Sequence, residues 1–225
     1  WQWDKMAKEI FTGATAILPI CKHLEKITNK HLPGKTTNVS YEGINPSRWY
    51  HVEGMKLKHP CVGLLQVSNW WGKAHEMLIL KKVLERMPNV HFYWAGDGPL
   101  RERVLSELNK YDNFHWLGNL EYPGEVRKFL SEIDIYALLS GIDMSPHTLL
   151  EASLIKKPVI ATNVGGVSES CKNNETCFLI EKNDPDDWID KISMLINNKE
   201  KMDERNPTKE IKCAIFFFLA SEIRM

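Results

Sequence analysis

The sequence has no excess of charge of either sign. Its 225 residues include 29 basic and 29 acidic side chains, and no block of Lys or Arg stands out. Binding to nucleic acid or to an anionic membrane relies on clustered positive charge. We therefore expect no nucleic-acid partner, and no anionic membrane as the main partner.

Long apolar runs and paired cysteines are also missing. The nearest approach to a membrane span is AIFFFLA at residues 214–220, far short of the roughly 20 residues that a span needs. Five cysteines without a CxxC pair favour reduced thiols and offer no metal site. The chain starts without Met or a signal-peptide pattern, so we expect a cytoplasmic protein whose sequence is entered partway.

Metal-ligand spacing is absent among the histidines as well. All of them except His147 are scattered along the chain, and we expect them to be structural or exposed. The GxGxxG fingerprint of dinucleotide-binding proteins is missing, which argues against an NAD enzyme. GxSxG is missing too, and this argues against a hydrolase nucleophile elbow.

What the sequence does contain, from Pro60 onward, is an alternation of strand and helix patterns. Short apolar runs of strand length are separated by segments with helical period. This alternation predicts an α/β fold, in which helices cover both faces of a parallel sheet. The predicted strands are residues 61–68, 90–96, 114–118, 133–140, 158–163 and 177–180, and the predicted helices are 72–87, 99–110, 121–132, 146–155 and 184–198. Asp184 is expected to cap the last helix.

The first 45 residues do not contain enough apolar sequence for a domain of their own. They suggest a strand at residues 14–20, a helix at 21–32 and a second strand at 36–41. A single βαβ unit has too little core to stand alone. We therefore divide the chain into an attached piece at 1–45, a main domain at 46–198 and a C-terminal tail at 199–225, which is expected to be helical.

The stretch GIDMSPHTLLEASL, residues 141–154, follows a predicted strand and opens a predicted helix. Ligands of open parallel sheets bind at the carboxyl ends of strands. Pro146 fits the first helical position, with Ser145 or Asp143 as the cap. The free backbone N–H groups of His147 and Thr148 would then form a site for an anion such as a phosphate.

Two acids lie around this helix start. Asp143 precedes the helix, and Glu151 lies about a turn and a half inside it with apolar neighbours. A carboxylate can accept two hydrogen bonds from a cis-diol such as that of ribose. Alternatively, Asp143 only caps the helix and Glu151 pairs with Lys156 or Lys157. The apolar surroundings of Glu151 favour a ligand role, because a buried acid normally needs a partner.

A second strand end, VSNWWGKAHE at residues 67–76, places Lys73 near the start of the next helix. A lysine there can neutralise a diphosphate as a mobile charge, or it can be an ordinary solvated lysine. GDGP at residues 96–99 is interpreted as a strand-to-helix turn that needs small residues.

Taken in order, these motifs resemble a known family. Asp143 and Glu151 in D-x7-E, followed by EASLIKKPVIATNVGGVSE, are similar to the E-x7-E block of retaining, nucleotide-sugar-dependent glycosyltransferases of group 1. VSNWWGKAHE, GDGP, FHWLGNL and NETCFLIEKNDPDDW are similar to further motifs of that family, and the resemblance covers residues 60–198. It implies a Rossmann-like, doubly wound parallel sheet that forms the C-terminal half of the two-domain GT-B plan. Residues 1–45 would then be a remnant of the acceptor-side domain.

The resemblance also implies an activity. Such enzymes transfer a sugar from a nucleoside diphosphate, such as UDP or GDP, to an acceptor with retention of anomeric configuration. No cofactor or metal is implied, and the acceptor is an unidentified glycan, lipid or small molecule. Peripheral membrane association is implied only through the N-terminal domain.

Residue roles follow from the same resemblance. Glu151 would bind the ribose hydroxyls, and Ser145 with the amides of His147 and Thr148 would hold the diphosphate. Lys73 would offset the charge that grows on the leaving group.

Asp143 would face the donor sugar, but it stands where the family has Glu. Asn69 is a further donor-binding candidate at a position where the family has Arg, and Pro146 stands where Gly is frequent. Two alternatives stay open: a nucleotide-sugar epimerase or phosphorylase on the same plan, or a non-catalytic module that binds nucleotide sugars. The departures at Asn69 and Pro146 support the second.

Overall fold

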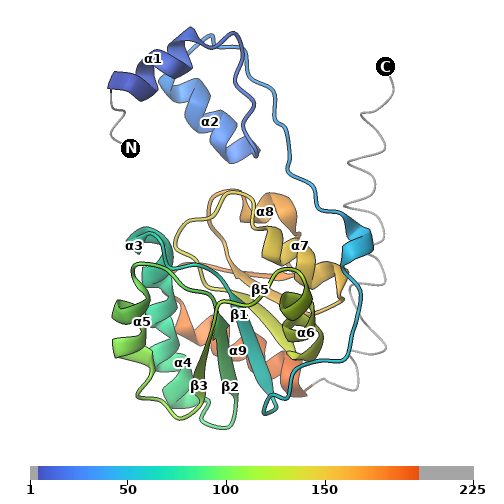
Figure 1. Cartoon of the computed structure of the whole chain (residues 1–225). Coiled ribbons are helices and arrows are strands. Elements are labelled where there is room, and N and C mark those ends of the chain that lie inside the picture. Colours follow the sequence, from blue (N-terminus) through green and yellow to red (C-terminus); the bar gives the residue numbers. More distant parts are fainter. Residues whose placement is uncertain (1–4, 198–225) are drawn as a thin grey trace.

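A computed structural model describes residues 5–197 of the chain. The tail at 199–225, with the helix predicted there, lies outside the described residues. The central feature is a parallel sheet with the strand order β3-β2-β1-β4-β5-β6 (Figure 1). The predicted parallel α/β sheet is therefore confirmed.

The strands are short and buried. All neighbouring pairs run parallel. The chain moves outward from β1 in one direction and returns to its other side at β4, which makes the β1/β4 boundary the switch point where such folds bind ligands. The strands are β1 (Cys61–Leu65), β2 (His91–Ala95), β3 (Phe114–Gly118), β4 (Ile135–Leu138), β5 (Val159–Thr162) and β6 (Phe178–Ile180).

Helices cover both faces of the sheet, as Figure 1 shows. Phe92 and Trp94 of β2 enter one core, and Tyr93 and Ala95 of the same strand enter the other. Because successive side chains of a strand point to opposite faces, a strand buried on both faces has a continuous apolar sequence. The helices of this domain are α3 (Trp71–Ala74), η2 (His75–Ile79), α4 (Leu80–Arg86), α5 (Arg101–Leu108), α6 (Gly124–Glu132), α7 (His147–Leu154), α8 (Val167–Ser170) and α9 (Pro185–Asn197).

Two helical details differ from the sequence prediction. The helix expected over 72–87 consists of α3, the 3₁₀ helix η2 and α4, and α8 was not predicted. By contrast, the cap of α9 is confirmed, since Asp184 Oδ1 accepts a hydrogen bond from Asp187 N at 3.0 Å.

The N-terminal piece holds α1 (Lys5–Gly13) and α2 (Lys22–His31), followed by the short 3₁₀ helix η1 (Pro46–Arg48). The helix predicted at 21–32 is confirmed as α2. The two predicted strands are wrong, because only one parallel bridge, between Ile17 and Thr37, is formed. Two segments without a third strand or a covered face gain too little to extend their pairing.

This piece lies over the α7 and α8 end of the sheet domain (Figure 1). Glu169 of α8 accepts hydrogen bonds from the backbone N–H groups of Lys22 and His23, at 2.8 and 2.9 Å, and from the Tyr41 hydroxyl at 3.1 Å. The chain then runs down the side of the sheet domain and enters β1 from the opposite end.

The cysteines correct another expectation. Cys171 and Cys177 form a disulfide, so the prediction of reduced thiols is wrong for this pair. The turn between them brings their Cα atoms to 6.0 Å, which the CxxC criterion does not detect. Among residues 5–197, Cys21 and Cys61 are free and buried. In the same range, no helix is long and apolar enough to span a membrane.

Candidate functional site

The predicted catalytic pair, Lys73 and Asp143, meets at the switch point of the sheet. Lys73 Nζ donates to Asp143 Oδ2 at 2.8 Å, and the two side chains are 24% and 10% exposed. The loops that carry them are also joined, since Gly141 N donates to Lys73 O at 3.2 Å. A solvated surface lysine is therefore not what the structure shows. Lys73 is a largely buried cation whose charge Asp143 balances.

Glu151 is buried on α7, with 3% of its surface exposed. Burial disfavours the carboxylate and raises the pKa of Glu151 to about 7, although a hydrogen bond from Tyr122 and the nearby His147 act in the opposite direction. The partner of Glu151 is thus Tyr122, and the alternative pairing with Lys156 or Lys157 is not observed. A buried carboxyl group with its pKa raised toward neutral pH is frequent at functional sites.

Tyr136 of β4 links the two acids in space. Its side chain is fully buried, and its hydroxyl shares a hydrogen bond of 2.6 Å with Thr148 Oγ1. Burial raises the pKa of Tyr136, and the charges of both Asp143 and Glu151 raise it further. Both acids therefore lie within electrostatic range of the same phenol.

The amino end of α7 differs in detail from the prediction. Pro146 is the N-cap residue and not the first helical residue, and no side chain caps the helix. Asp143 Oδ1 instead accepts from Met144 N at 3.0 Å, and Ser145 is only partly exposed beside it. The helix therefore begins at His147, one residue later than predicted.

The backbone N–H groups of His147 and Thr148 find no acceptor within the part of the chain that the structure describes. They remain available at the positive end of the helix dipole. The His147 ring Nε2 lies 3.1 Å from Glu42 Oε2, in the segment that leads out of the N-terminal piece.

A turn at Gly165 and Gly166 packs closely against the backbone of the Asp143 loop. Gly165 has a φ of +55°, and a Cβ atom added to it would lie 1.9 Å from Asp143 O. The N–H of Gly166 donates to the same carbonyl at 3.0 Å. The GG of the sequence motif is thus explained by a left-handed turn with close backbone packing.

A hollow of about 440 Å³ opens at the carboxyl ends of β1, β2 and β3. Its lining is formed by Val67, Asn69, Asp97, Gly98 and Asn119. Gly98 has a φ of +148°, and a Cβ atom there would lie 2.7 Å from Asn69 Oδ1. Glycine at position 98 therefore both permits the backbone conformation of the GDGP turn and leaves room for the side chain of Asn69.

Asn69, predicted as a donor-binding residue, lines this hollow, and several of its neighbours there were not predicted. Lys73, by contrast, points to Asp143. Three hollow residues were missed. Asn119 directly follows β3, and Val67 and Asp97 each lie two positions past the end of a strand, so the strand-end rule applied to every strand would have found them. Tyr122 and Tyr136 gave no such signal, because their partners are distant in the sequence.

The family model described as Glycosyl transferases group 1 matches residues 52–198. The chain belongs to the group 1 glycosyltransferases. A relative in Methanocaldococcus jannaschii, named only as an uncharacterized glycosyltransferase, is 26% identical over 193 residues, covering 84% of this chain and 52% of the relative. The chain thus spans about half the length of this curated relative, and about a third of the next two.

Solved structures show that this group 1 glycosyltransferase chain has the fold of a GT-B C-terminal domain. The C-terminal domain of a group 1 family protein (LpcC) from Francisella tularensis has a TM-score of 0.59 at 16% identity, covering 81% of this chain and 100% of that one. HepE from Anabaena, solved with UDP and glucose, has a TM-score of 0.69 at 17% identity and covers 87% of this chain and 58% of its own. The Rossmann-like fold and the family resemblance noted in the sequence are confirmed.

Proposed function

We propose that this chain contains the nucleotide-sugar site of a retaining glycosyltransferase. The enzyme would transfer a sugar from a nucleoside diphosphate to an unidentified glycan, lipid or small-molecule acceptor. The observation that carries the proposal is the Lys73–Asp143 ion pair just before the amino end of α7, together with the buried Glu151 on the same helix. Family membership supports it independently.

Glu151 is proposed to bind the ribose of the donor. A buried carboxyl group without a cation is stabilised when hydroxyl groups donate to it. The Tyr122 hydroxyl makes such a contact in the structure. Two ribose hydroxyls would replace or add to it.

The diphosphate is proposed to lie against the amino end of α7. Free N–H groups at His147 and Thr148, with Ser145 beside them and the helix dipole behind, stabilise negative charge. Lys73 would balance the charge that develops on the leaving diphosphate. Asp143, the present partner of Lys73, would face the donor sugar, and Asn69 would contact the donor from the hollow.

The domain division belongs to the proposal as well. Residues 46–198 would form the donor domain, and residues 1–45 a piece of the acceptor-side domain. Membrane association, if the whole protein has it, would come through that acceptor-side domain.

Calorimetry with UDP, GDP and ADP, and then with their glucose conjugates, tests the donor site. We expect one of these nucleotides to bind, and Glu151→Gln to weaken that binding about tenfold or more, since a hydrogen bond to a charged group contributes about 1.5–3 kcal/mol. Glu9→Gln, at an exposed position of α1, is the matched control and should bind like wild type. A folded wild-type protein that binds none of these ligands would contradict the proposal.

A non-catalytic nucleotide-sugar module is the second candidate. The observation that favours it is the pairing of Lys73 with Asp143, which leaves each charge already balanced, together with Asn69 in place of the family's Arg. Slow release of free sugar from the bound donor would distinguish the two. A transferase site hydrolyses the donor slowly and loses this activity in Lys73→Met, whereas a binding module shows no release.

A further inference from the structure

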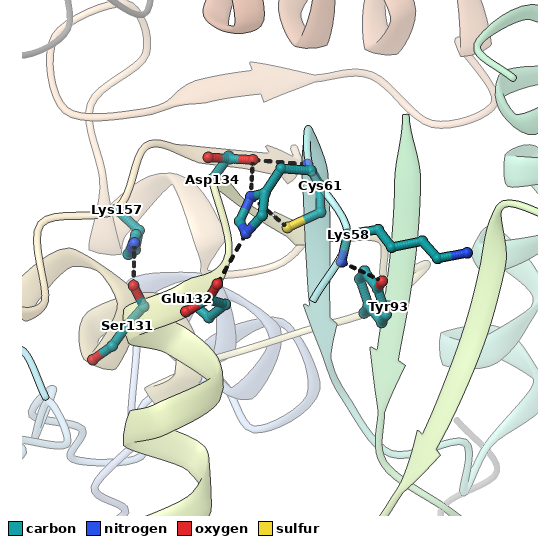
Figure 2. Close-up of polar contacts among 8 residues, drawn as sticks. Lys58, Cys61, Tyr93, Ser131, Glu132, Asp134 and Lys157 are labelled. Carbon is teal, nitrogen blue, oxygen red and sulfur yellow. Dashed lines mark hydrogen bonds and ion pairs between the residues drawn. The ribbon is translucent and has the colours of Figure 1, made fainter. Parts of the chain in front are cut away.

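A second polar cluster lies at the opposite end of the sheet, where β1 and β4 begin (Figure 2). His59, in the segment that enters β1, places Nδ1 2.7 Å from Asp134 Oδ2 and Nε2 2.9 Å from Glu132 Oε1. Glu132 ends α6 and Asp134 directly precedes β4. The cluster therefore joins the entering segment to a neighbouring strand.

The thiol of Cys61 completes this cluster. Cys61 is the first residue of β1 and is fully buried, with Sγ 3.6 Å from His59 Nδ1. Its backbone N–H donates to Asp134 Oδ2 at 2.8 Å. One nitrogen, one sulfur and one carboxylate oxygen, from His59, Cys61 and Asp134, all lie within 4.8 Å of one another.

We propose that His59, Cys61 and Asp134 form a binding site for a borderline-soft divalent cation, with Zn²⁺ as the preferred ion. Thiolate, imidazole and carboxylate are the ligands that Zn²⁺ takes in proteins. A hard cation such as Mg²⁺ or Ca²⁺ prefers oxygen ligands only. A water molecule would take the fourth position.

The spacing of the ligand atoms agrees with tetrahedral coordination. With Zn–N of about 2.0–2.1 Å and Zn–S of about 2.3 Å, the nitrogen and sulfur ligands of one zinc ion lie about 3.6 Å apart. His59 Nδ1 and Cys61 Sγ are 3.6 Å apart. The contact of 2.7 Å between His59 Nδ1 and Asp134 Oδ2 has to widen to about 3.3 Å, which a side-chain rotation of Asp134 supplies.

Glu132 supplies the outer contact that metal-binding histidines usually have. A histidine that binds metal through one ring nitrogen typically donates the other N–H to a carboxylate, which fixes the tautomer. Glu132 Oε1 is in place to accept from His59 Nε2. Glu132 itself is packed against the backbone of the entering segment, since a Cβ atom at Gly54 would lie 1.9 Å from Glu132 Oε2.

A reactive thiol is the other use that a cysteine beside a histidine can have. Burial raises the pKa of Cys61 to about 12, so its thiol is a poor nucleophile in the free protein. The site also lies at the amino end of β1, about 16 Å of strand away from the switch-point centre. A structural role is therefore inferred, in which the cation fixes the segment that enters β1.

Cobalt titration of the metal-stripped protein, without reductant, tests this site. Co²⁺ bound to a thiolate gives a charge-transfer absorption that marks the sulfur ligand, and Zn²⁺ should displace it. We expect one Co²⁺ per chain with this absorption, and a rise in Tm when Zn²⁺ is added. All proteins should carry Cys213→Ser, so that its thiol does not contribute.

Three variants make the result specific. Cys61→Ser should lose the absorption, whereas Cys21→Ser, at the other free buried cysteine of the described chain, should retain it. Asp134→Asn keeps the size of the side chain and should lower Zn²⁺ affinity at least tenfold, which keeps the test valid even if Cys61→Ser folds poorly. Absence of the absorption in wild type, or its persistence in Cys61→Ser, would overturn the proposal. Nucleotide binding should be the same with and without Zn²⁺, so this test stands apart from that of the donor site.

Discussion

Glu151 is the residue whose chemistry depends most on its surroundings. In an unfolded chain its carboxyl group titrates near 4.5, whereas burial raises the pKa to about 7 in the folded protein. Between these values the folded state binds a proton more tightly than the unfolded state does. The contribution of Glu151 to the free energy of unfolding therefore falls as pH rises from about 4.5 to about 7, and then stays constant.

Glu151→Gln should remove this pH dependence. Since one pKa unit corresponds to about 1.4 kcal/mol, the variant should gain up to about 3 kcal/mol relative to wild type between pH 5 and pH 8. Urea unfolding at the two pH values measures the difference. Glu9→Gln is the control, and an equal effect of Glu151→Gln at both pH values would show that burial does not govern this carboxyl group.

Lys73 and Asp143 should behave as a coupled pair. Lys73→Met leaves a largely buried carboxylate without its cation, and we expect a loss of about 1–3 kcal/mol in the free energy of unfolding. Asp143→Asn in the same chain should restore part of it. A double-mutant cycle by urea unfolding gives the coupling energy, and additive effects would show that the ion pair is not important for stability.

At the scale of elements, the turn at Gly165 and Gly166 determines where the Asp143 loop lies. Gly165→Ala forces a side chain into a left-handed conformation and against Asp143 O. We expect a loss of at least about 1–2 kcal/mol in stability from the backbone conformation alone, together with weaker nucleotide binding.

Gly124→Ala is the matched control for this turn. Gly124 begins α6, and a Cβ atom there has no neighbour within 4 Å. Alanine should be neutral or slightly stabilising at this position. Thermal unfolding and nucleotide calorimetry of the two variants compare the effects, and similar results for both would argue against a supporting role of the Gly165 turn.

Most elements of the sheet domain could be predicted from sequence, because strands buried on both faces leave continuous apolar runs. The N-terminal strands could not, since their short apolar segments have no sheet to join, and the periodicity of residues 72–87 does not separate a 3₁₀ turn from an α-helix. Pro146 was placed one position too far into the helix, which is the usual uncertainty of helix ends.

The residues of the candidate site also fall into two groups, those predictable from local sequence and those that only the folded chain reveals. Asp143, Glu151 and Lys73 stood out through local motifs. Tyr122 became visible only when the chain was folded, because its contact with Glu151 joins the segment before α6 to helix α7. The polar cluster of His59, Cys61 and Asp134 was missed for the same reason. His59 and Cys61 are close in sequence, but Asp134 comes next to them only through the pairing of β1 with β4.

At the scale of the whole molecule, Glu169 joins the N-terminal piece to the sheet domain. Its carboxylate lies at the amino end of α2, where it accepts from two backbone N–H groups and from Tyr41. Acidic groups are favourable at this end of a helix. Burial, together with this hydrogen bond, raises the pKa of Tyr41 to about 12.

Glu169→Gln should loosen α2 without affecting the sheet. Replacing the charged acceptor removes about 1.5 kcal/mol, so amide hydrogen exchange in α2 should become about tenfold faster, while β1 and β4 exchange as before. Glu175→Gln, in an exposed ion pair with Lys172, is the control. Unchanged exchange in α2 would show that the N-terminal piece is held by other contacts.

The side chain of His147 connects the amino end of α7 with the segment that carries Glu42. It sits on the first residue of α7, where an anion would settle, and it is already engaged with Glu42 from the connecting segment. A phosphate bound at the proposed site would compete with the Glu42 carboxylate for one ring. Binding of a donor at the proposed site would therefore be linked, through this single side chain, to the position of the segment that carries Glu42.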